Sequence, residues 1–200
     1  MNSTVGLRVI REVERTPEAA IAEFSRFAVP DISDAMHRFG ALDGGVCAVD
    51  DAMRVAGPAI TVRLSAGDNL MIYQALEVCR PGDVLVIETR RSTLTAIWGD
   101  KLSRLAKDAG VAGMVTDGCV RDRAGIRAVG LPVFASPIHA ANGPHKNGPG
   151  EVNTPVSVGG VAVLPGDLIV GDADGVVVVH RTDVAAVLEC VLARRPGVTA

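Results

Sequence analysis

Short runs of Val, Ile and Leu between Gly- and Pro-containing turns constrain this chain more than any other feature. Runs this short, rich in β-branched residues, are typical of buried strands. With only 3% aromatic residues, the core must be built from small aliphatic side chains. We expect strands at Val55–Leu64, Val84–Glu88, Gly113–Thr116, Pro132–Ala135, Leu168–Val170 and Val176–Val179.

Other segments carry apolar residues at helical spacing. We expect helices over residues 16 to about 27, Ile32–Phe39, Asn69–Cys79, Thr93–Ala109, Arg123–Val129 and from Thr182 to near Arg194. Helices come first, then strands alternate with helices, and strands follow. This order predicts a mixed α/β or α+β fold, and no linker divides residues 1–200, so we expect a single domain. Eight strand–helix repeats are absent, which argues against a (β/α)₈ barrel.

Several residues predict where these elements begin, bend or end. Thr16 before Pro17, and Thr182, are typical helix N-caps, and Gly110 is typical of a helix C-terminus. We expect the segment 29–31, which contains a proline, to separate the first two helices. Gly57-Pro58 predicts a bulge or an edge position in the first strand.

Two Pro-Gly-Asp sequences, at residues 81–83 and 165–167, each precede a strand. Pro sets the first position of a type II turn, and Gly takes the positive φ that follows. Gly159-Gly160 lies between Val156–Val158 and Val161–Val163, so we expect a hairpin there.

The charge pattern excludes some classes of partner. Net charge is −3, and no run of Lys and Arg exceeds two residues. A nucleic-acid-binding protein normally carries a basic stripe, so we expect no nucleic-acid role. No signal peptide or membrane span is expected, which predicts a cytoplasmic protein. Its four widely spaced cysteines, Cys47, Cys79, Cys119 and Cys190, would be reduced there.

The strongest chemical signal is a pair of segments, 98–102 and 117–122. Arg121 and Asp122 follow a short apolar strand and precede a predicted helix, where ligands bind in open α/β sheets. The Arg121 guanidinium suits a carboxylate bidentately. The Asp122 carboxylate suits Mg²⁺ or Mn²⁺, which need only one or two protein oxygens. Arg-Asp pairs are common, however, and most are simply solvated.

Twenty residues, 101–120, separate Asp100 from Arg121-Asp122. This spacing resembles the Asp, twenty residues, Arg-Asp signature of the RraA-like class II aldolases. The resemblance covers most of the chain, including Ile32-Ser33-Asp34-Ala35, Ala56-Gly57-Pro58-Ala59, residues 80–84 and 96–99, Pro132-Val133-Phe134, Asn153-Thr154-Pro155-Val156, residues 159–161 and 165–167, and Asp172-Ala173-Asp174-Gly175-Val176.

The resemblance implies a layered α/β sandwich similar to the phosphohistidine swivelling domain, assembled as a homotrimer or dimer of trimers. It implies that Gly99, Asp100, Lys101 and Leu102 contact substrate and that Arg121 binds the substrate's carboxylate and oxo end. Asp122 would ligate the metal, Mg²⁺ or Mn²⁺, while Asp100 holds the metal's waters. The implied catalytic residues are therefore Asp100, Arg121 and Asp122.

The implied reaction is retro-aldol cleavage of 2-oxo acids such as 4-hydroxy-4-methyl-2-oxoglutarate to pyruvate, with decarboxylation of oxaloacetate. Some RraA-like proteins instead bind and inhibit a ribonuclease, and a broader acid hydratase or lyase is a third reading.

Other candidate residues favour structural roles. His139 and His145 lie six positions apart in a Gly- and Pro-rich loop over 136–150, which is not a helical metal pair. Asp172 and Asp174 are expected to form a turn. Cys119 lies inside the best motif, but a small buried filler is the more ordinary role for it.

Overall fold

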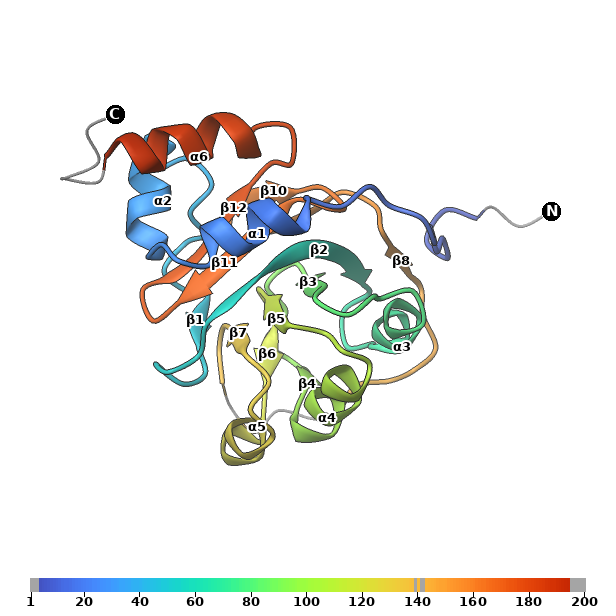
Figure 1. The fold of residues 1–200 in the computed structure, drawn as a ribbon. Helices are drawn as coiled ribbons and strands as arrows, with labels where there is room; N and C mark the ends of the chain where they lie inside the picture. The colour runs from blue at the N-terminus through green and yellow to red at the C-terminus, as the bar shows by residue number, and fades with distance from the viewer. Residues whose placement is uncertain (1–3, 139, 141–142, 195–200) are drawn as a thin grey trace.

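A computed structural model describes residues 4–138, 140 and 143–194 and shows a mixed α/β fold, as expected (Figure 1). The helices are α1 (Glu18–Phe24), α2 (Val29–Ala35), α3 (Leu70–Leu76), α4 (Asp100–Asp108), α5 (Arg123–Val129) and α6 (Val184–Ala193). The strands are β1 (Cys47–Ala48), β2 (Val55–Leu64), β3 (Val84–Glu88), β4 (Ala96–Trp98), β5 (Gly113–Thr116), β6 (Cys119–Val120), β7 (Val133–Ala135), β8 (Gly150–Val152), β9 (Val156–Val158), β10 (Val161–Val163), β11 (Leu168–Asp172) and β12 (Gly175–Val179).

The main sheet has eight strands in the order β1-β7-β5-β3-β2-β11-β12, with β8 also paired to β2. Its centre is parallel, since β2, β3, β5 and β7 run in one direction. Strands β11 and β12 form an antiparallel hairpin that joins the far side of β2. Helical crossovers link the parallel strands, which accounts for the alternation of strands and helices in the sequence.

Helices cover both faces of the sheet, and the alternation of side chains along β12 shows how. Val177 and Val179 pack with α1, α2 and α6, where Phe24 and Ile32 are fully buried. Val176 and Val178 point to the other face, whose core includes side chains from α3, α4 and α5. Each fully buried valine stabilises the fold by about 1.5–3 kcal/mol, so both faces contribute.

The two Pro-Gly-Asp turns have the predicted geometry. Gly82 and Gly166 have φ of +91° and +84°. In each turn the aspartate accepts a hydrogen bond from the backbone N–H three residues earlier: Arg80 N to Asp83 Oδ2 at 2.6 Å, and Leu164 N to Asp167 Oδ2 at 2.8 Å. The expected Gly159-Gly160 hairpin also forms, between β9 and β10.

Several expected helix boundaries are wrong. The second helix begins at Val29 rather than Ile32, because Pro30 occupies its first turn, where a missing N–H costs no hydrogen bond. Neither Thr16 nor Thr182 caps a helix with its side chain. The Thr16 hydroxyl donates instead to the Gly166 carbonyl at 2.9 Å. Gly110 does follow the end of α4 with a φ of +80°, as expected.

The largest correction concerns the helix expected over 93–109. Residues 96–98 form strand β4, and α4 begins only at Asp100. All three residues of β4 are buried, and the strand pairs with β6. Pairing with a distant strand therefore overrides the apolar spacing, which continues into α4 and resembles one long helix.

Strand β2 is internal, so the expected edge position is wrong. Pro58 is tolerated because the Ala59 N–H bonds the Asp167 carbonyl on the β11 side, and Pro58 therefore faces the opposite side. On that side the pairing with β3 starts only at Ala59. The missing N–H of Pro58 thus falls where no neighbouring strand needs it.

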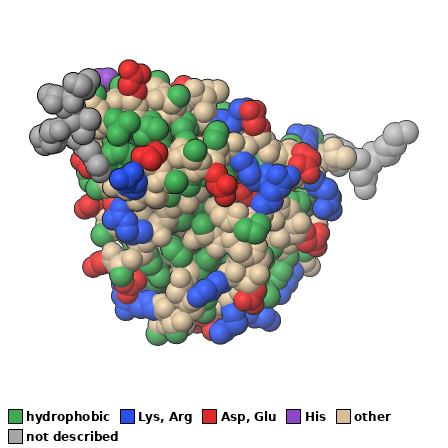
Figure 2. Space-filling model, viewed as in Figure 1, with side chains coloured by type: hydrophobic (Ala, Val, Ile, Leu, Met, Phe, Trp, Pro, Cys, Tyr) green, Lys and Arg blue, Asp and Glu red, His purple; other side chains and the backbone are tan. Residues whose placement is uncertain are grey.

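The surface is of mixed charge on the face that Figure 2 shows, where blue and red side chains are interspersed. Within the described residues, no helix is both long and apolar enough to span a membrane.

Candidate functional site

Two parallel strands bring the two predicted site segments together. Strand β4 pairs with β6, and the Arg121 N–H donates to the Trp98 carbonyl at 3.0 Å. Gly99-Asp100 leaves the end of β4, and Arg121-Asp122 leaves the end of β6. Residues separated by twenty positions in sequence therefore lie side by side, at the starts of α4 and α5.

Gly99 and Asp122 make the closest approach in the site. A Cβ on residue 99 would lie 2.6 Å from Asp122 Oδ2, so a side chain there would displace the carboxylate. Asp122 itself has φ 62° and ψ 41°, a left-handed conformation that is uncommon outside glycine. Such strained positions gather at functional sites, and this one turns the chain into α5 while leaving the carboxylate half exposed, at 48%.

The Arg121 side chain is likewise part-exposed, at 44%, and its Nε lies 3.6 Å from Asp122 Oδ2. At that distance the ion pair is loose and screened by solvent, so it contributes little to stability. The guanidinium also lies near Gly143, where a Cβ would be 3.7 Å from one of its terminal nitrogens.

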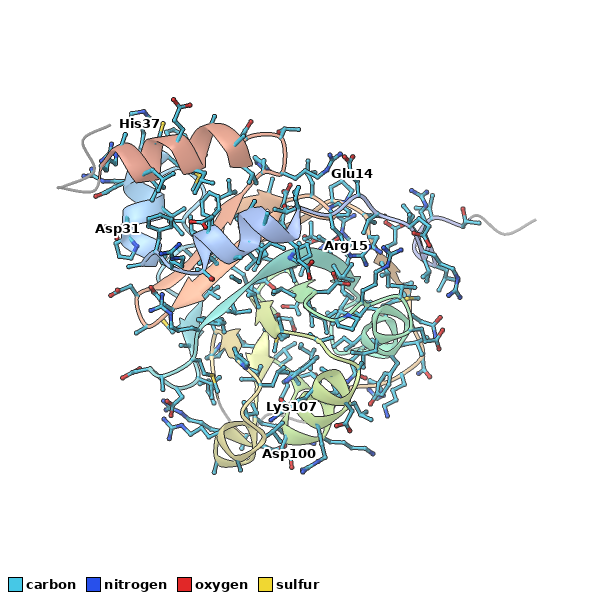
Figure 3. The ribbon with its side chains drawn as sticks, viewed as in Figure 1. Glu14, Arg15, Asp31, His37, Asp100 and Lys107 are labelled. Atoms are coloured by element: carbon cyan, nitrogen blue, oxygen red, sulfur yellow. The ribbon has the colours of Figure 1, made fainter. Side chains whose placement is uncertain are left out.

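Asp100 lies in the first turn of α4 and faces α5, in the lower part of Figure 3. A Cβ on Gly125 would lie 2.6 Å from the Asp100 Cβ, so the absence of a side chain at 125 lets the two helices meet. Asp100 Oδ2 also lies 3.3 Å from an Arg104 nitrogen, one helical turn later. Asp100 therefore borders the site from a rigid helix.

Lys101 and Leu102 complete the first turn of α4. Lys101 is exposed, whereas Leu102 is 5% exposed and packs into the core. The start of the helix is held by Ser103, whose hydroxyl accepts from Trp98 Nε1 at 2.7 Å and donates to the Gly99 carbonyl at 3.1 Å. Leu102 thus offers mainly its backbone to a ligand.

All the predicted site residues line one cleft of about 430 Å³. Asn69, Tyr73 and Lys146 line it too, and sequence reasoning missed them. Asn69 precedes a helix, and Lys146 lies in a loop rich in Gly and Pro, so neither position carries a pattern that points to a ligand. The other lining residues are Ala96, Ile97, Trp98, Gly143 and Pro144.

Asp117, in the same motif, has a structural role. It is 6% exposed and accepts hydrogen bonds from the Thr89 N–H at 2.7 Å and the Arg91 N–H at 3.1 Å. Arg90 and Arg91 both have a φ of 57°, and this carboxylate holds them in that turn. Asp117 therefore ties the end of β5 to the end of β3.

A larger cleft, of about 520 Å³, lies elsewhere, along Arg63, Arg90 and Glu151. The Glu151 carboxylate already has a hydrogen-bond partner, because it accepts from the Gly6 N–H at 3.0 Å. This hydrogen bond lowers the pKa of Glu151. Arg63 pairs with Glu88 at 2.8 Å. Size alone does not mark a site, and this cleft lacks the converging groups of the smaller one.

The alternative candidates keep structural roles. His139 lies outside the described residues, and the backbone of His145 bonds Gly67 and Asn69. Asp172 accepts from the Val29 and Asp174 N–H groups, so it forms the expected turn. No three His, Cys, Asp or Glu side chains gather as a metal-binding group in the part of the chain described.

Two of the four thiols, those of Cys79 and Cys119, are held in surroundings that do not favour reactivity. Cys119 is fully buried in β6, which supports the filler role. Burial raises the pKa of Cys79 to about 12, so that side chain is a neutral thiol at physiological pH.

Comparison with known proteins identifies a family that this chain resembles in sequence. The family model RraA-like, described as Aldolase/RraA, matches residues 29–178. A protein of Halalkalibacterium halodurans named "Putative 4-hydroxy-4-methyl-2-oxoglutarate aldolase" is 39% identical over 169 residues, which cover 84% of this chain and 80% of that protein.

Two solved structures have the same fold. Streptomyces coelicolor RraAS2, described as an unusual member of the RNase ES inhibitor RraA protein family, superposes with a TM-score of 0.80 at 31% identity, covering 91% of this chain and 94% of that one. The RNA-processing inhibitor RraA from Thermus thermophilis superposes with a TM-score of 0.69 at 33% identity, covering 76% and 92%.

Proposed function

Because the chain belongs to the RraA-like family, we propose that it is a divalent-metal-dependent class II pyruvate aldolase. The substrates are 2-oxo acids of the 4-hydroxy-4-methyl-2-oxoglutarate type, and oxaloacetate is decarboxylated at the same site. The observation that carries the proposal is the convergence of Asp100, Arg121 and Asp122 in one cleft. The name of the Halalkalibacterium relative supports this chemistry over others.

The donor set fits a hard divalent cation. Asp122 presents a half-exposed carboxylate that packs against Gly99, where a side chain would displace it, and Asp100 adds a second carboxylate to the cleft. Mg²⁺ and Mn²⁺ keep several waters and need only one or two such oxygens. Asp122 would ligate the ion directly, and Asp100 would hold its waters. A bound ion would supply Lewis acidity toward the 2-oxo carboxylate.

The chain's own residues account for the other steps. The Arg121 guanidinium binds the substrate carboxylate and stabilises the negative charge that develops on the pyruvyl part. The C4 hydroxyl proton passes to a water that Asp100 orients, and the C3–C4 bond breaks as the C4 carbonyl forms. The electron pair of that bond stays with C3, which is then protonated to give pyruvate. Lys101 is exposed and forms no part of this scheme, which needs no Schiff base.

Pyruvate release tests the proposal. We expect the protein to release pyruvate from 4-hydroxy-4-methyl-2-oxoglutarate and from oxaloacetate with Mg²⁺ or Mn²⁺. With one direct ligand the ion should be held weakly, so EDTA should abolish the activity and added metal should restore it. A coupled lactate dehydrogenase assay, with enzyme-free samples as the control, measures both. Full activity in a metal-free sample would contradict the proposal.

A second candidate function is inhibition of a ribonuclease. It is favoured by the likeness to the Thermus RraA structure, which is described as an RNA-processing inhibitor, and to RraAS2, which is described as an unusual member of an RNase inhibitor family. Binding a ribonuclease needs no metal and no Asp122. A variant that loses pyruvate release yet still inhibits would separate the two functions, and a wild-type protein that inhibits without releasing pyruvate would favour this second one.

We also propose that the chain assembles as a homotrimer or dimer of trimers. Large apolar side chains are exposed in the single chain: Phe39 and Leu94 are each 81% exposed, and Val5 is 70% exposed. Burial between subunits would remove them from water. We expect light scattering to give three or six times the chain mass of 20.7 kDa. A monomer that persists at all concentrations would contradict this.

A further inference from the structure

The cleft contains a cationic side chain that the proposed mechanism does not use. Lys146 lines the cleft with Arg121, and its Nζ lies 4.7 Å from the centre of the Tyr73 ring. Over residues 4–138, 140 and 143–194, no carboxylate lies within 4.0 Å of this ammonium group. The ring contact is worth only about 0.5–1 kcal/mol at an exposed site, so the lysine keeps most of its capacity to bind an anion.

The loop that carries Lys146 is firmly attached. Asp68, 5% exposed, accepts from the Asn147 N–H at 2.6 Å. On the other side of the lysine, the Asn69 N–H donates to the His145 carbonyl at 3.0 Å. Both neighbours of Lys146 are thus fixed to residues just before α3. These hydrogen bonds hold the loop in place, so that the Lys146 ammonium group lies at the cleft.

Asn69 gives a second, independent sign of a ligand. It is 3% exposed and lines the cleft, and its Nδ2 donates to the Ile97 carbonyl at 3.1 Å, which fixes the orientation of the amide. Its Oδ1 is buried, and no partner for it exists among the residues described. A buried acceptor without a donor is costly, so a bound hydroxyl would relieve a real deficit.

The charges of the cleft favour a substrate with two negative groups. Three cationic side chains, Lys101, Arg121 and Lys146, line it against two carboxylates, Asp100 and Asp122. A divalent ion would raise the positive excess further. One substrate carboxylate is taken by Arg121 in the proposed reaction, which leaves Lys146 without an anion.

We infer that Lys146 binds the second carboxylate of the substrate, on the C4 side, and that Asn69 Oδ1 accepts a hydrogen bond from the C4 hydroxyl. Lys146 is then the residue that selects dicarboxylic 4-hydroxy-2-oxo acids over monocarboxylic ones. This inference rests on the proposed function. Asp68 and Tyr73 position the lysine.

The test compares two substrates in Lys146→Gln. One is 4-hydroxy-4-methyl-2-oxoglutarate, and the other is a 4-hydroxy-2-oxo acid in which a methyl group replaces the distal carboxylate. We expect KM for the dicarboxylate to rise roughly 10-fold, the effect of one lost charged contact at an exposed position. For the monocarboxylate, both KM and kcat should stay within about twofold of wild type. Lys146→Arg should restore most of the dicarboxylate affinity.

Arg26→Gln is the matched control, because it removes one positive charge from an exposed position just after α1, and Arg26 does not line the cleft. Added salt should also raise KM for the dicarboxylate more than for the monocarboxylate, since an exposed lysine is readily screened.

Three results would overturn the inference. If Lys146→Gln raises KM for both substrates equally, or for neither, Lys146 does not bind the distal carboxylate. The proposed function would still stand. If Arg26→Gln has the same effect as Lys146→Gln, only the overall charge matters. If the wild-type protein with Mg²⁺ releases pyruvate from neither substrate, the proposed function fails and the inference with it.

Discussion

Asp122→Ala is expected to lower kcat/KM for pyruvate release by more than about 10³-fold, with no rescue by moderately raised Mg²⁺. Removing a single charge-stabilising donor costs roughly 10²–10³-fold. Asp122 should cost more, because the ion that it holds serves both substrate binding and charge stabilisation. Coupled pyruvate assays over a range of Mg²⁺ and substrate concentrations measure the loss.

Arg121→Lys is compared with Asp122→Ala, because it alters the site without removing the metal ligand. Lysine keeps the positive charge but not the planar fork, so substrate binding and rate should both fall, by about 10²-fold in kcat/KM. Measurable activity should remain at high substrate. Asp108→Ala, at the exposed end of α4 and away from the cleft, serves as the control for loss of one carboxylate.

The two site variants should remain folded, because both side chains are about half exposed. Unchanged circular dichroism and melting temperature would show this. Near-normal pyruvate release by Asp122→Ala would show that the site is misassigned, and ribonuclease inhibition would then become the better account of this chain.

Asp83→Ala is expected to have the largest effect on stability, lowering the free energy of unfolding by about 3–5 kcal/mol. Asp83 is 1% exposed and binds the Arg15 guanidinium through two oxygens, at 2.7 and 2.9 Å. This contact raises the pKa of Arg15, so alanine would leave a permanent charge in a nearly buried position without its partner. Arg15 lies just before α1, beside β2 in Figure 3.

For a chain of this size the melting temperature should fall by on the order of 10 °C, measured by calorimetry. Glu12→Ala is the matched control, because it breaks the exposed ion pair between Glu12 and Arg80 and should change stability little. The double variant Asp83→Ala with Arg15→Met should recover part of the loss, since it removes the unpaired charge. Equal melting temperatures for Asp83→Ala and Glu12→Ala would show that the buried pair contributes nothing.

Local chemistry made much of this fold predictable. The Pro-Gly-Asp turns were predicted correctly because Gly82 and Gly166 carry their conformational preference within the turn itself. The valine-rich strands β3 and β12 were also predicted with nearly the right bounds, since a short apolar run between turns has few other solutions.

The elements that sequence reasoning missed depend on partners far along the chain. Strand β4 exists because β6 lies beside it, and its residues Ala96–Trp98 look helical without that partner. Strand β8 pairs with β2 through residues about ninety positions apart, such as Val62 and Val152. No local pattern reports such a pairing.

In the candidate site, too, some residues could be predicted from the sequence and others could not. The sequence marks Asp100, Arg121 and Asp122 through their spacing, and the pairing of β4 with β6 explains why that spacing matters. Asn69 and Lys146 lie in the cleft only because the loop after β7 folds back onto the start of α3. That contact joins residues more than seventy positions apart, so only the folded structure shows it.

The position of β2 in the sheet has a consequence for synthesis on the ribosome. One side of this strand pairs with β3, which follows soon after it. On the other side, Val62–Leu64 pair with β8, but Val55–Pro58 have no partner until β11 is made. Until residues 168–172 emerge, the nascent chain carries an open strand edge. The apolar side chains of α1 and α2 also lack the strands β11 and β12 against which they pack. A chain truncated before β11 should therefore aggregate rather than fold, and the growing polypeptide depends on chaperones or on rapid completion.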